Sequence, residues 1–75
     1  MPLIQIKVVE GVLTTDEKSQ MISKVTDAVL SVYGENLRPH TWVMIEDVAE
    51  GQWGLGGTGL TTAAVQELRG AVTAK

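Results

Sequence analysis

Cysteine is absent from this sequence, which excludes disulfides, thiol chemistry and cysteine-ligated metal sites. His40 is the only histidine, so a histidine metal cluster is excluded as well. Basic residues are few: six Lys and Arg stand against nine Asp and Glu, for a net charge of −3. Nucleic-acid binding needs a basic stripe that such a chain lacks. We therefore expect no metal, no other cofactor and no nucleic-acid partner.

Long apolar runs are also missing. No segment is long enough to span a bilayer, and the chain does not open with a charged-then-apolar signal. We therefore expect a cytoplasmic protein with no membrane partner. A chain of 75 residues forms one domain at most, so 1–75 is expected to be a single domain. Chains this short rarely build a sufficient core alone, which leaves oligomerisation as the means of stabilisation.

The most informative feature that is present lies at the second residue. An initiator Met1 before a small residue is usually trimmed, and Pro2 would then carry a free secondary amine. Such a nitrogen is both a base and a nucleophile toward carbonyls. Residues 3–9 predict a strand, which would anchor Pro2 instead of leaving it on a frayed end. The role requires removal of Met1, because with Met1 attached the nitrogen is an amide and is not basic.

The pattern after this strand predicts a helix. Thr14 and Glu17 form a capping-box signature, and Gly34 is expected to end the helix as a left-handed cap. Spacings of three and four residues predict one apolar stripe, made of Met21, Ile22, Val25, Ala28, Val29 and Val32. Pro39 is expected to bar further helix.

A second strand is predicted over residues 41–47, which are rich in β-formers. Strand, helix and strand make a β-α-β unit of the α/β (α+β) class, with parallel strands. The helix can cover one face of the sheet. The other face carries Trp42 and Met44, and nothing else in the chain is large enough to cover it. We therefore expect another subunit there.

Residues 51–57 hold four glycines and cannot form a regular element. The segment lacks the lysine and spacing of a phosphate-binding loop. It favours a hairpin arm that lays Trp53 and Leu55 on a neighbouring subunit. Residues 61–62 then cap a short helix, whose apolar side is Ala64, Val65 and Leu68.

Together these features resemble the tautomerase superfamily, specifically the oxalocrotonate tautomerase-like small subunits, over about residues 2–57. The stretches that carry the resemblance are Pro2-Leu3-Ile4-Gln5-Ile6, Glu10-Gly11, the helix start near Asp16-Glu17-Lys18, the second strand, and Gly51-Gln52-Trp53-Gly54-Leu55-Gly56-Gly57. The resemblance implies a tautomerase/MIF-like fold, in which β-α-β units dimerise into a four-stranded sheet and three dimers commonly make a homohexamer. It also implies a cofactor-free keto–enol tautomerase with Pro2 as general base.

Two departures bear on the substrate. Dicarboxylate-isomerising members have an arginine after the Glu-Gly pair and another early in the second strand; here Val12, Leu13 and Trp42 stand there. The bidentate grip of a guanidinium on a carboxylate is therefore lost. An apolar or aromatic enol or 2-oxo acid, such as an arylpyruvate, is expected instead. The residues expected to line its pocket are Val9, Leu13, Trp42, Trp53 and Leu55.

Arg38 and His40 precede Trp42, and either could donate to a single carboxylate or enolate. Alternation along a strand would place His40 on the face of Trp42. Blander interpretations stay open: Arg38 as a solvated loop charge, His40 as a strand-entry residue satisfied by backbone, and both tryptophans as intersubunit packing. Two further hypotheses stay open for the chain, namely Pro2 as a nucleophile and a non-catalytic oligomeric binding or scaffold protein.

Overall fold

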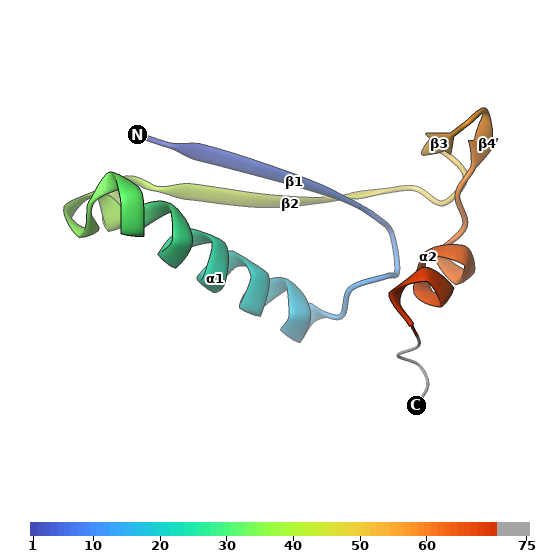
Figure 1. Ribbon diagram of the computed structural model, residues 1–75, viewed down its shortest axis with the longest axis horizontal. Helices are drawn as coiled ribbons and strands as arrows, with labels where there is room; N and C mark the ends of the chain where they lie inside the picture. The colour runs from blue at the N-terminus through green and yellow to red at the C-terminus, as the bar shows by residue number, and fades with distance from the viewer. Residues whose placement is uncertain (71–75) are drawn as a thin grey trace. The chain divides into compact units, whose positions relative to one another are not determined.

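The computed structural model describes residues 1–70, which belong to two compact units. Residues 1–6 and 14–46 form the first unit; residues 7–13 and the chain from residue 47 onward form the second. Strands β1 (Leu3–Val9) and β2 (Trp42–Val48) each run from the first unit into the second. The remaining elements are α1 (Thr15–Tyr33) and the 3₁₀ helix η1 (Glu35–His40) in the first unit, and β3 (Gly54–Leu55), β4 (Thr58–Gly59) and α2 (Thr62–Arg69) in the second (Figure 1).

The two long strands pair as the β-α-β pattern predicts. At their first residues the Trp42 N–H donates to the Pro2 carbonyl at 3.0 Å, and at their last residues the Glu10 N–H donates to the Val48 carbonyl at 2.8 Å. Both strands therefore run in the same direction, and α1 is the crossover between them. Strand β2 occupies 42–48, one residue later than predicted.

Helix α1 begins where its capping box places it. The Thr14 hydroxyl accepts from the Glu17 N–H at 3.1 Å, and the Glu17 carboxylate accepts from the Thr14 N–H at 2.9 Å. These two bonds satisfy amides that the first turn of a helix leaves unpaired. Gly34 ends the helix, but its φ of 113° and ψ of 133° are not left-handed helical, so that detail of the prediction is wrong.

The prediction that Pro39 bars further helix is also wrong, because Pro39 lies inside η1. Proline lacks only its own N–H, and the bonds on either side of it sustain a short 3₁₀ turn. Leu37 N–H donates to the Gly34 carbonyl at 3.1 Å, and Thr41 N–H donates to the Arg38 carbonyl at 3.3 Å.

Burial along α1 follows the predicted stripe only in part. Met21, Val25 and Val29 are half-buried, whereas Val32 is 91% exposed. Leu30, which the stripe omits, is the one buried residue of the helix, at 4% exposed. Helical periodicity assigns residues to faces, but the segment that follows decides which face is covered near the last turn. Here η1 packs back against α1.

One face of the strands in the first unit is bare, as the sequence predicts. Leu3, Trp42 and Met44 are 55%, 58% and 48% exposed, while the alternating Ile4 and Val43 are half-buried. Strand alternation places the first three on a common face. The structure therefore leaves an apolar sheet face exposed.

The second unit contains the hairpin and α2. Strands β3 and β4 pair Gly54 with Gly59 and Leu55 with Thr58. The two residues between the strands, Gly56 and Gly57, have φ of 61° and 87°, which fits a type I′ turn and needs residues that tolerate positive φ.

Helix α2 is capped by Thr61, whose hydroxyl accepts from the Ala64 N–H at 3.1 Å, as predicted. Among the described residues of the second unit, the buried apolar ones are Val9 and Val12, at 5% and 6% exposed. Ala64 and Val65 are half-buried and Leu68 is 78% exposed, so the predicted apolar side of α2 is covered only in part within the described chain. No helix of residues 1–70 has the length and apolar character that a membrane span requires.

Candidate active site

Pro2 is held at the head of the sheet in the first unit. It is half-buried, precedes β1 by one residue, and its carbonyl accepts the Trp42 N–H at 3.0 Å. This hydrogen bond fixes the start of the chain against β2, so the anchoring expected from residues 3–9 is present. The Pro2 nitrogen is therefore held in a fixed position within the first unit.

An apolar hollow of about 360 Å³ flanks this position. It is lined by Met1 and Leu3, the residues on either side of Pro2, and by Trp42 and Met44 of β2. The volume lies within the range of small-molecule sites. Because all four side chains are apolar, the hollow suits an apolar or aromatic group and offers no charge to bind an acid.

Sequence reasoning identified Trp42 as a lining residue but did not place Leu3 and Met44 in the site. The signal was present, because Met44 alternates with Trp42 on β2 and Leu3 begins the paired strand β1. The sequence analysis places Met44 only on the uncovered sheet face. The hollow therefore lies on that face.

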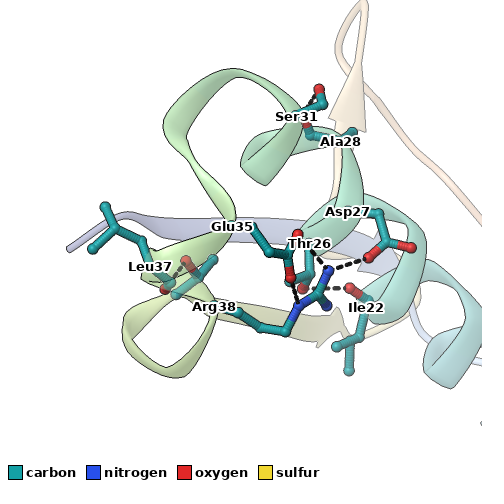
Figure 2. A network of polar contacts seen from close by, with 9 residues as sticks. Ile22, Thr26, Asp27, Ala28, Ser31, Glu35, Leu37 and Arg38 are labelled. Atoms are coloured by element: carbon teal, nitrogen blue, oxygen red, sulfur yellow. Dashed lines mark hydrogen bonds and ion pairs between the residues drawn. The ribbon is translucent and has the colours of Figure 1, made fainter.

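Arg38 is engaged by carboxylates of its own unit (Figure 2). Its Nη2 donates to Asp27 Oδ1 at 2.9 Å and to Glu35 Oε1 at 3.2 Å, and its Nε donates to Glu35 Oε2. The Arg38 hydrogen bond lowers the pKa of the Glu35 carboxyl, and the bonds to Glu35 and Asp27 raise the pKa of Arg38. Arg38 thus ties η1 to α1.

His40 is exposed and is the last residue of η1, two positions before β2 begins at Trp42. The alternation that would put His40 on the face of Trp42 does not apply, since residues 35–40 are helical. The expectation that strand alternation places His40 beside Trp42 is therefore wrong. Among the described residues, the His40 side chain makes no hydrogen bond or ion pair with another side chain or backbone group.

The other predicted site residues belong to the second unit. Val9 is buried in its core, Leu13 and Trp53 are half-buried, and Leu55 is 64% exposed on β3. The Trp53 carbonyl accepts the Leu60 N–H at 2.8 Å, which sets the base of the hairpin. In residues 1–70, no group of three or more His, Asp or Glu side chains is arranged to hold a metal ion.

Comparison with known proteins gives a consistent result. A family model described as Tautomerase enzyme matches residues 2–63. Probable tautomerase K2 of Dickeya dadantii (strain 3937) is 33% identical over 61 residues, which cover 81% of this chain and 90% of that protein.

Two solved structures are similar in sequence and in fold. DmpI from Helicobacter pylori is 34% identical with a TM-score of 0.69, over 79% of this chain and 95% of that chain. A structure from a study of the 4-oxalocrotonate tautomerase isozymes of Methylibium petroleiphilum is 34% identical with a TM-score of 0.70, over 85% of this chain and 97% of that chain.

Proposed function

This chain belongs to the tautomerase family and is a tautomerase-type isomerase, and we propose that it interconverts the enol and keto forms of a small 2-oxo acid without a cofactor, with the amine of Pro2 as general base. The observation that carries the proposal is the place of Pro2. Its carbonyl is hydrogen-bonded to Trp42 at the head of the sheet, and it lies beside an apolar hollow whose lining includes Leu3, Trp42 and Met44, the lining residues that stay when Met1 is removed.

In the proposed reaction the Pro2 amine, free once Met1 is removed, accepts the hydroxyl proton of the enol. The oxygen becomes a carbonyl oxygen, and the electrons of the carbon–carbon double bond take up a proton at carbon from the resulting ammonium. The base is regenerated and no atom is gained or lost. One group therefore serves as base and then as acid.

Apolar surroundings favour this role. We expect apolar side chains such as Leu3, Trp42 and Met44 to lower the pKa of the amine, because a charged ammonium loses solvation beside them. A base whose pKa lies near the ambient pH is both free to accept a proton and strong enough to do so. We therefore expect the activity to rise with pH as the Pro2 amine deprotonates.

For the substrate we propose an apolar or aromatic 2-oxo acid, such as an arylpyruvate, in preference to a dicarboxylate. Trp42 and its neighbours in the hollow offer apolar surface, and Val12 is buried where the resemblance has an arginine. His40 is our proposed donor to the one carboxylate, because Arg38 is already paired with Glu35 and Asp27.

We further propose a homohexamer made of three dimers. The buried apolar residues in the described chain are only Val9, Val12 and Leu30, and two strands with one covered face rarely persist alone in water. The exposed sheet face and the exposed Leu55 of the hairpin are the surfaces that an assembly would cover, which would put the hollow at a subunit interface. Light scattering coupled to gel filtration tests this, and a monomer at micromolar concentration would refute it.

The catalytic proposal is tested by following the ketonisation of phenylenolpyruvate by ultraviolet absorbance. Protein whose intact mass shows Met1 removed is compared with Pro2→Ala and with protein that retains Met1, in which the Pro2 nitrogen is an amide. Loss of a general base costs about 10²- to 10⁴-fold in rate, so protein that retains Met1 is expected to lose at least about 10²-fold. Trimmed Pro2→Ala keeps a primary amine at this position and tests whether the secondary amine of proline is needed. Equal turnover in trimmed protein and in protein that retains Met1 would refute the role of the Pro2 amine.

A further inference from the structure

Helix α2 is attached to the turn after β1 by side-chain hydrogen bonds, all within the second unit. Gln66 Nε2 donates to the Val12 carbonyl at 2.9 Å, and Arg69 Nη1 donates to the same carbonyl at 3.1 Å. Thr62, the first residue of α2, donates from its hydroxyl to the Glu10 carbonyl at 2.7 Å. Three side chains of one short helix therefore engage two carbonyls of residues 10–13.

Glu10 and Glu50 extend this attachment. The Glu10 carboxylate accepts the Glu50 N–H at 3.1 Å, and the Glu50 carboxylate accepts the Thr62 N–H at 2.6 Å. Gly11 has a φ of 82°, and a Cβ there would lie 3.1 Å from Thr62 Cγ2. The turn thus approaches the start of α2 closely at a residue with no side chain.

The apolar side chains of α2 are covered only in part. Ala64 and Val65 are only half-buried, and Leu68 is 78% exposed. An eight-residue helix is too short to be stable by itself in water. The polar contacts with residues 10–13 are therefore a principal constraint on where α2 lies, and equally on the conformation of the turn.

Most of α2 lies after residue 63, where the match to the tautomerase family ends. The helix is thus an addition to the segment that the family model describes. It is attached to the turn that contains Leu13, for which the sequence predicts contact with substrate.

We propose that α2 is a clasp that holds residues 10–13 in one conformation, and that Gln66 and Arg69 hold this turn together through the Val12 carbonyl. The clasp is independent of the proposed reaction. Removing one of two donors from a shared carbonyl weakens the turn and leaves the rest of the helix in place.

The clasp is tested in the full-length chain with Gln66→Ala, Arg69→Ala and Arg69→Lys. Glu67→Ala is the control, because Glu67 is an exposed residue of the same helix. Hydrogen exchange is read at the Val12 amide, which donates to the Val9 carbonyl, with the Leu60 amide of the hairpin as internal reference. Loss of a typical hydrogen bond is expected to speed Val12 exchange about five-fold in the two alanine variants. Arg69→Lys, which keeps a cationic donor, is expected to restore slow exchange.

Glu67→Ala is expected to leave Val12 exchange unchanged, because its side chain makes none of these contacts. Unchanged Val12 exchange in both alanine variants would overturn the clasp. The exchange comparison needs no turnover, so its result does not depend on the proposed function.

Discussion

Arg38 and His40, the two residues of the first unit that sequence reasoning linked to a substrate carboxylate, are predicted to respond differently to replacement. Arg38 makes three hydrogen bonds to Glu35 and Asp27. His40 is exposed and makes none within residues 1–70. We predict that Arg38→Ala leaves the KM for an aryl 2-oxo acid within about two-fold of its original value, whereas His40→Ala raises it.

The magnitudes follow from charge and geometry. Arg38 and its two carboxylate partners together carry one net negative charge, so the group does not attract a substrate carboxylate. Engaging substrate would also require Arg38 to give up its present bonds. A charge-assisted hydrogen bond from His40 to a carboxylate would change affinity roughly 10- to 150-fold when lost. His40→Gln keeps a hydrogen-bond donor at this position and should give a KM between the other two.

The assay is steady-state ketonisation of phenylenolpyruvate with Arg38→Ala, His40→Ala and His40→Gln, each checked by circular dichroism for an intact helix signal. A ten-fold rise in KM for Arg38→Ala with native helicity would refute the reasoning from its ion pairs. An unchanged KM for His40→Ala would remove His40 from the site.

Three further predictions concern the framework. Thr14→Ala removes the capping box and is expected to lower the free energy of unfolding by about 1 kcal/mol, measured with denaturant at fixed protein concentration. Ser19→Ala, at an exposed position of the same helix, is the control, and an equal loss in both variants would contradict the cap. The pKa of Glu35 lies below the ordinary 4.5 because the carboxylate accepts from Arg38, so its stabilising contact persists above that value and is lost as pH falls through the lowered pKa. In Arg38→Ala, carbon-13 NMR titration should find that the pKa of the Glu35 carboxyl rises toward its ordinary value, and an unchanged pKa would contradict the pairing. In the hairpin turn, Gly56→Asn should be tolerated, whereas Gly57→Val should destabilise the protein by about 1 kcal/mol or more, because a β-branched residue is strained at a φ of 87°. Equal stability of the two variants in thermal unfolding would argue against the type I′ turn.

Much of the fold could be predicted because it depends on neighbours in sequence. The strand at 3–9, the cap at Thr14 and the cap at Thr61 are each specified by residues within one turn or one strand repeat. Parallel pairing of β1 and β2 follows from the helical crossover between them. These predictions are confirmed.

Most of the misses fall between residues 30 and 40, at the end of α1 and in η1. Leu30 is buried and Val32 exposed although the helical period favours the reverse, and η1 packs against that end of α1. Arg38 pairs with Asp27, eleven positions away, so it could not be separated from a substrate ligand by composition. His40 lies in a 3₁₀ helix, which removed the alternation argument.

For the candidate site, sequence alone identified Pro2, the apolar character of Trp42 and the absence of the two expected arginines, because these depend on residue chemistry and on position along the chain. Tertiary structure alone decided that the Pro2 carbonyl accepts the Trp42 N–H, and that Leu3 and Met44 line one hollow with Trp42. It alone also decided that α2 engages the Val12 carbonyl. Those contacts join residues about 40 to 60 positions apart, and a local pattern carries no information on pairs so distant until the strands have paired and the chain has folded back.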